Sequence, residues 1–338
     1  SYSTENTIRL KPRYNDFDLL NSQETMSLYQ EMNDKGYFGI TNSLYGRRSG
    51  IYYQLYKDLS TINPATGEYY LPNTPEARMN FLRQREYANT NWFDHLFTLK
   101  PITNHAITIS GGGKNSATYA SIGFYNDAGW TIADKVSRFT ANVKNTFYIN
   151  DKFTATLTTQ ANVRSQKAPG TMPQRKNNTL GVFERDFDIN PFSYALGTSR
   201  TLRPYNEDGS LEYYRNNWAP FNILNEYDNN KMNISVLDFK VQGEGTYRLN
   251  QDMAIKVLLS MRQAYTSTTH EVHEGSNIVQ ALELLSENPR PFGSKKLTND
   301  EKYRVRVGNY RILYEIHEDI ITVEVVKIGH RKDVYKKK

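Results

Sequence analysis

Two arms of alternating side chains, between Val136 and Arg164, constrain the fold of this chain more than any other feature. The first arm reads VSRFTANVKNTFYI and the second, after three turn-forming residues, reads FTATLTTQANVR. Because side chains alternate across a β-strand, each arm has one apolar and one polar face. Each arm is also long enough for a tilted strand to cross a bilayer. The stretch therefore predicts a hairpin of two long strands. Its apolar positions are Phe139, Ala141, Val143, Phe147 and Ile149, then Phe153, Ala155, Leu157, Ala161 and Val163.

The same pattern recurs further along the chain, from Ser235 to Met261, around a second turn at Asn250–Asp252. The segments FYINDKF and YRLNQDM therefore predict two hairpin turns of the same kind. Strands of soluble β-sandwiches also alternate, but they usually run about five or six residues. The polar faces here are dense in Thr, Asn, Gln and charged residues, which suits the water-filled interior of a membrane barrel. The pattern leaves a soluble sandwich open and favours the barrel.

The connections between predicted strands alternate in length. They are short at 111–116 and 150–152, longer at 126–135, very long at 165–232, and short again at 250–252. Outer-membrane barrels join their strands by short turns on one side and by long loops on the other, so this alternation favours the barrel further. The longest connection is rich in proline, which predicts that it lacks regular helices and strands.

The first hundred residues predict fewer regular elements. We expect a strand over Tyr2–Leu10 and a helix that begins near Asn21 and ends before Gly36. Residues 37–88 show no period and predict an elaborated loop, broken by one short helix over Thr74–Glu86. Thr74 would be its N-cap and Pro75 its first helical residue. Further strands are expected over 105–110 and 117–125.

Composition excludes several classes of protein. The chain has no cysteine, which excludes disulfides and thiolate metal sites. Its hydrophobic content is 38%, with no apolar run near 18 residues, so a helical membrane protein is excluded while a half-polar barrel strand is not. The opening SYSTENTIRLKPR has no signal-peptide pattern, so an outer-membrane protein with this start would be a mature fragment or would lack its beginning.

The sequence changes character near Ile278. Helical spacing of apolar residues is followed by Pro289, and then by three short strands that we expect over 303–307, 310–316 and 320–328. Residues 290–338 hold 13 Lys and Arg against 7 Asp and Glu, so the whole net charge of +6 lies there. Any polyanionic partner therefore belongs to this segment.

Arginines follow a pattern in this C-terminal segment. Arg304 and Arg306 are two residues apart on a strand and share one face, Arg311 begins the next strand, and Arg331 and Tyr335 follow the last one. Several guanidinium groups and an aromatic ring suit a phosphodiester and a stacked base. A solvated basic face is the other interpretation. The six scattered histidines show no metal-ligand spacing, so we expect neither a metal nor a cofactor.

Part of the sequence resembles SusC-type TonB-dependent outer-membrane transporters over residues 1–277. NTNWFD (89–94), followed by ITISGGGKNSATYASIGFYNDAGW (107–130), is similar to the start of their barrel, and SYSTENTIRLKPR resembles the segment after their plug domain. The resemblance implies a fragment of a barrel in the outer membrane that imports glycans or peptides. It also implies two partners, TonB and a SusD-like surface lipoprotein, although about seven strands and no TonB-contacting segment are expected here.

The C-terminal segment, 278–338, resembles RelE/ParE-type toxins, on the RelE side. NPRPFGSKKL, YRVRVGNYRILYEI and VVKIGHRKDVY carry this resemblance. It implies a cytoplasmic endoribonuclease that cleaves mRNA on the ribosome and is held by a cognate antitoxin. Arg311 and Arg331 would then stabilise the phosphorane or serve the leaving group, Arg304 and Arg306 would neutralise phosphates, and Tyr335 would position the substrate or stack on it. Arginine is a poor general base, and His330 is an alternative.

The predicted fold is mainly β. It consists of a partial antiparallel outer-membrane β-barrel with long extracellular loops, followed by a small α+β, RelE-like segment of one helix and a three-stranded meander. Three functions follow as hypotheses: an outer-membrane nutrient transporter fragment, a ribosome-dependent mRNA endoribonuclease, and a non-functional chimera of the two. The two resemblances place their segments in different compartments, the outer membrane and the cytoplasm.

Overall fold

The computed structural model places two compact units, which are described separately. Unit 1 comprises Ser1–Lys11, Phe97–Pro169 and Lys231–His270, and unit 2 comprises Pro12–Leu96, Gly170–Asn230 and Glu271–Lys338. The residues described are 1–36, 51–169, 175–176, 183–184, 189–216, 219–291, 294–298, 300–307, 310–317 and 322–330.

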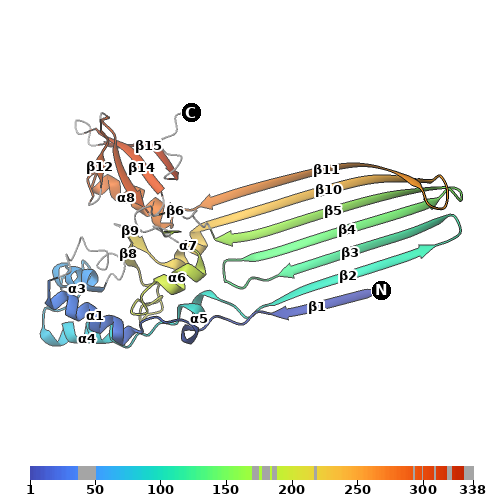
Figure 1. Cartoon of the computed structure of the whole chain (residues 1–338). Coiled ribbons are helices and arrows are strands. Elements are labelled where there is room, and N and C mark those ends of the chain that lie inside the picture. The colour runs from blue at the N-terminus through green and yellow to red at the C-terminus, as the bar shows by residue number, and fades with distance from the viewer. Residues whose placement is uncertain are drawn as a thin grey trace. The chain divides into compact units, whose positions relative to one another are not determined.

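Unit 1 is one seven-stranded antiparallel sheet with the strand order β1-β2-β3-β4-β5-β10-β11 (Figure 1). Strands β10 and β11 have 19 residues each, so the predicted long strands are confirmed. The bounds are β1 Tyr2–Ile8, β2 Pro101–Gly112, β3 Ser116–Asp127, β4 Lys135–Tyr148, β5 Phe153–Pro169, β10 Asn230–Arg248 and β11 Ala254–Val272.

The register of this sheet aligns the predicted apolar faces of neighbouring strands. Phe139 on β4 lies opposite Phe124 on β3 and Val163 on β5. Val163 in turn lies opposite Leu237 on β10. Because cross-strand partners point to the same face, the alternation in each strand adds up to one continuous apolar face.

The two predicted hairpin turns have the same geometry. Asn150 Oδ1 accepts the backbone N–H groups of Lys152 at 2.9 Å and Phe153 at 2.8 Å. Asn250 Oδ1 accepts those of Asp252 and Met253 at the same two distances. An asparagine side chain that bonds the backbone two residues on replaces a backbone turn, which explains why both joints begin with this residue.

The helices of the N-terminal part of unit 2 are α1 (Ser22–Asp34), α3 (Ile51–Ser60), α4 (Pro75–Glu86) and α5 (Trp92–Leu96). The two predicted helix starts are confirmed. Asn21 and Glu24 form a capping box at α1, and Thr74 caps α4 by accepting the Ala77 N–H. The prediction of a loop before Thr74 is wrong at α3, which buries Ile51, Tyr52 and Leu55 on one face. The spacing of Ile51 and Leu55 gives this helix an amphipathic pattern, and burial of that face stabilises it.

The prediction that residues 165–232 lack regular elements is also wrong. Strand β5 continues into this stretch as far as Pro169. Pro191 begins a helix, α6, at the position where a missing N–H costs nothing, and Asn190 caps it. The elements within the stretch are β6 Arg175–Lys176, β7 Phe183–Glu184, α6 Pro191–Gly197, β8 Tyr214–Asn216, β9 Ala219–Phe221 and α7 Ile223–Asn229.

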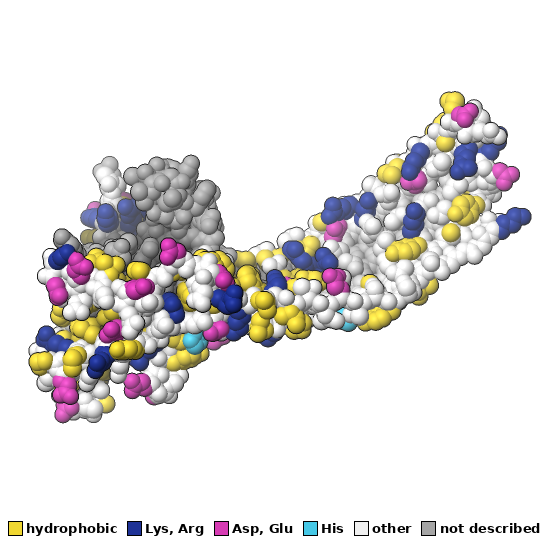
Figure 2. All heavy atoms as spheres, turned by 60° about the horizontal axis from the view of Figure 1, so that its bottom comes forward, with side chains coloured by type: hydrophobic (Ala, Val, Ile, Leu, Met, Phe, Trp, Pro, Cys, Tyr) yellow, Lys and Arg dark blue, Asp and Glu magenta, His cyan; other side chains and the backbone are white. Residues whose placement is uncertain are grey.

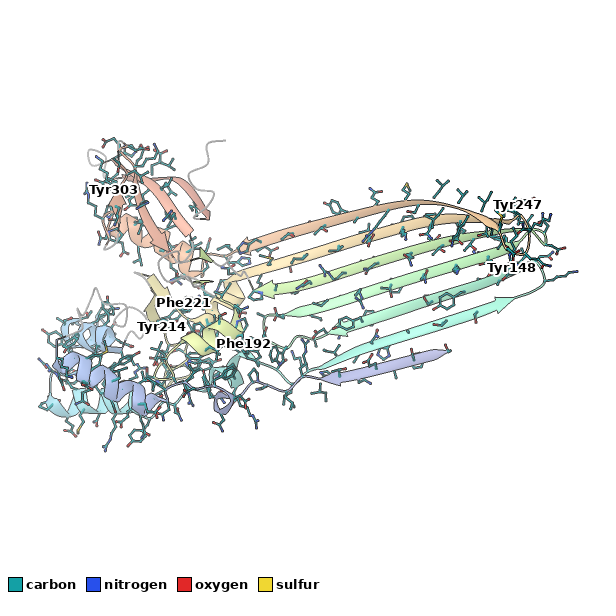
Figure 3. All side chains as sticks on the ribbon, viewed as in Figure 1. Tyr148, Phe192, Tyr214, Phe221, Tyr247 and Tyr303 are labelled. Carbon is teal, nitrogen blue, oxygen red and sulfur yellow. The ribbon has the colours of Figure 1, made fainter. Side chains whose placement is uncertain are left out.

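Aromatic side chains form much of the core that joins these segments of unit 2. Trp92 on α5 is 1% exposed and meets Tyr194 on α6 edge-on, with 5.1 Å between ring centroids. Tyr214 on β8 packs against Phe221 on β9, with 5.4 Å between ring centroids, and Figure 3 labels both. No helix among the described residues is both long and apolar enough to span a bilayer.

The C-terminal part of unit 2 consists of a helix and a four-stranded sheet. The expected helix and meander are present, but a two-residue strand, β12, adds a fourth strand that pairs with β13. The turns expected at 308–309 and 317–319 fall largely outside the described residues, and His317 belongs to β14. The bounds are α8 Asn277–Glu287, β12 Lys295–Lys296, β13 Tyr303–Val307, β14 Tyr310–His317 and β15 Thr322–His330.

Candidate functional site

The first candidate site is the apolar face of the seven-stranded sheet. Its large side chains are exposed, although most are of the kind that normally lies in a core. Soluble proteins rarely expose a contiguous apolar patch of this extent, so the face requires apolar surroundings. These side chains, each 39–75% exposed, are Ile107, Ile109, Ile122, Phe124, Phe139, Val143, Phe147, Leu157, Val163, Leu237, Phe239, Ile255, Val257, Leu259 and Met261.

The opposite face of the sheet carries polar and charged side chains, which favour contact with water. Arg262 on β11 pairs with Asp238 on β10 at 2.7 Å, and Lys256 pairs with Glu244 at 2.8 Å. Figure 2 shows charged side chains of both signs spread over the sheet, with hydrophobic ones between them. Ionised side chains on one face and exposed aliphatic ones on the other give the sheet two different preferred environments.

Aromatic side chains lie near the hairpin ends of the strands. Tyr148 is the last residue of β4, and Tyr247 lies one residue before the end of β10. Figure 3 shows both close to the turns that follow these strands. Tyrosine has an apolar ring and a polar tip, and it is enriched where a membrane meets water.

The second candidate site is the face of the C-terminal sheet that carries Arg304, called here the basic face. In the ladder, Arg304 lies opposite Leu313 and Lys295, and Arg306 lies opposite Arg311. The cationic positions of three strands therefore share one face, as predicted for Arg304 and Arg306. Arg304 and Arg311 are partly exposed and also take part in contacts within the protein.

The other face of this sheet is apolar and is covered by α8. Val305, Ile312 and Tyr314 are at most 2% exposed and form one cluster with apolar side chains of the helix. The Tyr314 hydroxyl donates to the Pro289 carbonyl at 2.8 Å, which fixes the chain just after α8. The helix thus leaves the basic positions on the side it does not cover.

Of the three other residues predicted for this site, only His330 lies among the described residues. Arg331 and Tyr335 lie outside the described residues. His330 is the last residue of β15, where its backbone pairs with Tyr310. Lys295 was missed by the sequence reasoning, because two residues give no strand signal. The lysine pair at 295–296 followed by the apolar Leu297 was the available hint.

A buried ion cluster in unit 2 was also missed. The Arg85 side chain is 3% exposed and pairs with Glu212, which is 4% exposed; Arg203 Nε donates to the same carboxylate at 2.9 Å. Burial lowers the pKa of Arg85, while the charge of Glu212 opposes that shift. These residues are far apart in the sequence, and no local pattern indicates that they meet.

A second buried carboxylate, Glu226 on α7, is 1% exposed. Its Oε1 accepts the backbone N–H of Asn277 at 2.8 Å. Burial raises the pKa of Glu226 to about 7. Within the described ranges, no three His, Cys, Asp or Glu side chains gather as metal ligands.

Comparison with known proteins connects the C-terminal sheet to a family. Residues 275–335 match the ParE toxin family of type II toxin–antitoxin systems, parDE. The predicted resemblance of this segment to RelE/ParE-type toxins is therefore confirmed. The match is to the ParE model, and the finer assignment to the RelE side stays a prediction.

The chain is also similar to transporters. It matches the TonB-dependent receptor SusC of Bacteroides thetaiotaomicron with 39% identity over 56 residues, which are 17% of this chain and 6% of that protein. The structure resembles the RagAB peptide transporter, with a TM-score of 0.53 and 13% identity over 93% of this chain and 31% of that one. The closed-closed RagAB peptide importer gives a TM-score of 0.52, with the same identity and coverage. The chain thus spans less than a third of these relatives, and the structural likeness concerns the fold.

Proposed function

We propose that residues 1–277 are part of a SusC-like, TonB-dependent transporter of the outer membrane. The exposed apolar face of the seven-stranded sheet is the observation that carries this proposal. A sheet with one lipid-facing and one wet face matches the strand pattern of outer-membrane barrels. In a membrane, the backbone groups of the outer strands β1 and β11 need further strands as partners, as a barrel provides.

The partners and the cargo follow from the same proposal. The helices and short strands of unit 2 that precede α8 connect strands β1 to β2 and β5 to β10, and they would form the long extracellular loops. A SusD-like surface lipoprotein would bind on that side and TonB on the other. The cargo would be a glycan or a peptide. The similarity to the SusC receptor and to the RagAB peptide importer supports this class.

The membrane proposal predicts that charge is tolerated on one face of β4 and not on the other. We expect Val143→Arg to lower the free energy of unfolding in lipid by about 2–4 kcal/mol, since Val143 would lie near the middle of the bilayer. Lys144→Arg, on the polar face, is the matched control and should have little effect. Urea titration in lipid vesicles measures both variants. Equal tolerance of arginine at the two positions would contradict a lipid-facing sheet.

We propose a second function, for residues 278–338: binding and cleavage of mRNA by a cytoplasmic, ribosome-dependent endoribonuclease with a cognate antitoxin. The register of the C-terminal sheet favours it, because the basic positions 295, 304, 306 and 311 lie on one face. Arginine binds phosphate through charge-assisted hydrogen bonds, so such a face suits a phosphodiester. The match to a toxin family of toxin–antitoxin systems supports the class.

In the proposed reaction, a ribose 2′-oxygen attacks the adjacent phosphorus and the bond to the 5′-oxygen breaks. The 2′-hydroxyl loses a proton, and the leaving oxygen gains one. Arg311 and Arg331 would stabilise the charge of the phosphorane, and Arg304 and Arg306 would bind flanking phosphates. Tyr335 would stack on a base. Arginine keeps its proton, so His330 or a water molecule would accept that of the 2′-hydroxyl.

The basic face makes a prediction about RNA binding. We expect Arg311→Ala to weaken the binding of single-stranded RNA and to reduce its salt slope by about 0.7, the value for one lost phosphate contact. Lys296→Ala is the control, because Lys296 lies opposite Tyr303 and therefore on the other face. Fluorescence anisotropy at several salt concentrations measures both. The same loss in the two variants would contradict a binding site on the basic face.

A further inference from the structure

Helix α8 is too apolar around its circumference for a helix with one partner. Its apolar residues occur at 278, 279, 281, 282, 284 and 285. At about 100° per residue they cover an arc of about 220°, whereas a helix that packs against a single layer needs a stripe of about 100°. The sequence of α8 therefore requires cover on more than one side.

The structure places two parts of unit 2 against α8. Ile278, Ala281 and Leu285 pack in one cluster with Val305, Ile312 and Tyr314 of the C-terminal sheet, and Val279, Leu282 and Leu284 pack against that cluster. Helix α8 also contacts β9, in the long connection between β5 and β10. The helix thus has neighbours both in the C-terminal sheet and in the long connection.

Hydrogen bonds fix the start of α8 to the same connection. Glu226 accepts the Asn277 backbone N–H at 2.8 Å, and Asn277 Nδ2 donates to the Pro220 carbonyl at 2.5 Å. Just before the helix, Asn225 Nδ2 donates to the Gly275 carbonyl at 2.7 Å. A Cβ at Gly275 would lie 2.8 Å from Asn229 Oδ1, so a larger residue does not fit there without movement.

We propose that α8 is a shared element and that Glu226 and Asn277 clasp the toxin-like sheet to the 219–230 segment, so that the two fold as one cooperative unit. This assigns an intrachain interface that the match to the toxin family does not include, since that match begins at residue 275. The interface does not depend on either proposed activity. The proposal predicts that a substitution of Glu226 destabilises strands β13 and β14, although Glu226 does not contact them.

Hydrogen exchange in the full chain, purified in detergent, tests the clasp. Glu226→Ala leaves the Asn277 N–H buried without an acceptor, so we expect exchange in α8, β13 and β14 to quicken by roughly tenfold. Glu283→Ala is the matched control, because Glu283 is exposed on the polar side of α8. The amides of β4 in unit 1 serve as an internal reference and should not change.

Faster exchange in α8, β13 and β14 together, with β4 unchanged, supports the shared helix. Faster exchange at the start of α8 alone, with β13 and β14 unchanged, would overturn it, because the sheet would then be stable without the clasp. If Glu226→Ala also alters β4, Asn277→Ala is the milder variant, since it removes only the bond to the Pro220 carbonyl.

The pH dependence of the same exchange provides a second readout. The folded pKa of Glu226, about 7, is above its usual value of 4.5, so its contribution to stability is largest below pH 4.5 and is lost as the pH rises to about 7. Tyr213 is the titratable group that faces it, with its own pKa raised by burial and by Glu226. Glu226→Gln keeps the acceptor, and we expect it to flatten the pH dependence of exchange in α8 and β13. An unchanged pH profile would exclude Glu226 as the titrating group.

Discussion

Replacing Glu212 by alanine is expected to lower the free energy of unfolding of unit 2 by about 3–5 kcal/mol. The carboxylate is buried between Arg85 and Arg203, and its removal leaves the buried Arg85 guanidinium without its hydrogen-bonded counter-charge, with the smaller charge interaction of Asp58 remaining. The other hydrogen bonds of Arg85 are weak: its Nε has no hydrogen-bond partner, and its contact with Gln54 is long, at 3.4 Å. Breaking one partner of a buried ion pair therefore costs more than the pair itself contributes.

Urea unfolding followed by tryptophan fluorescence measures this loss, in a Trp130→Phe background so that the remaining tryptophans belong to unit 2. Glu207→Ala is the control, because Glu207 lies nearby on the exposed surface. Glu212→Gln, which keeps the shape and some hydrogen bonds, should fall between the two. If Glu212→Ala were as stable as Glu207→Ala, the buried cluster would contribute nothing to unit 2.

Trp92→Ala is the second change with a large expected effect, a loss of about 3–5 kcal/mol from unit 2. Trp92 is 1% exposed, packs edge-on against Tyr194, and donates from Nε1 to the Ser199 carbonyl at 3.3 Å. Its removal opens a cavity between α5 and α6 and leaves the partly buried Ser199 carbonyl with one donor fewer. The long connection between β5 and β10 should loosen as a result.

Pulse proteolysis across a urea series measures the effect of Trp92→Ala without relying on fluorescence. Tyr87→Ala is the matched aromatic control, since Tyr87 is 62% exposed and should cost little. The strands of unit 1 should remain equally resistant in both variants. Comparable losses from the two substitutions would show that Trp92 does not organise the core of unit 2.

The strands of unit 1 could be predicted from the sequence because their signal is local. Each arm alternates with a period of two, and Asn150 and Asn250 mark the turns, so neither the strands nor the hairpins depend on distant residues. The helix caps at Asn21 and Thr74 are equally local. The C-terminal helix and meander were predictable for the same reason, apart from the two-residue strand β12.

Most of the elements that were missed depend on contacts between distant segments. Helix α3 is the exception, because Ile51 and Leu55 lie at helical spacing and are buried on one face, so its signal was local and was overlooked. Helices α6 and α7 lie in a proline-rich stretch whose aromatic residues find partners elsewhere in unit 2. For the basic face, strand alternation could place Arg304 and Arg306 together. Only the register of the sheet brings Lys295 and Arg311 opposite them.

A labelling scan of β4 tests the central proposal, a lipid-facing sheet, most directly. The chain has no cysteine, so a single cysteine at each position from Arg138 to Phe147 can carry a unique fluorophore. In lipid vesicles we predict that doxyl lipids quench the label at positions 139, 141, 143, 145 and 147, and that aqueous iodide quenches it at positions 138, 140, 142, 144 and 146. Quenching by iodide at every position, without alternation, would contradict the account.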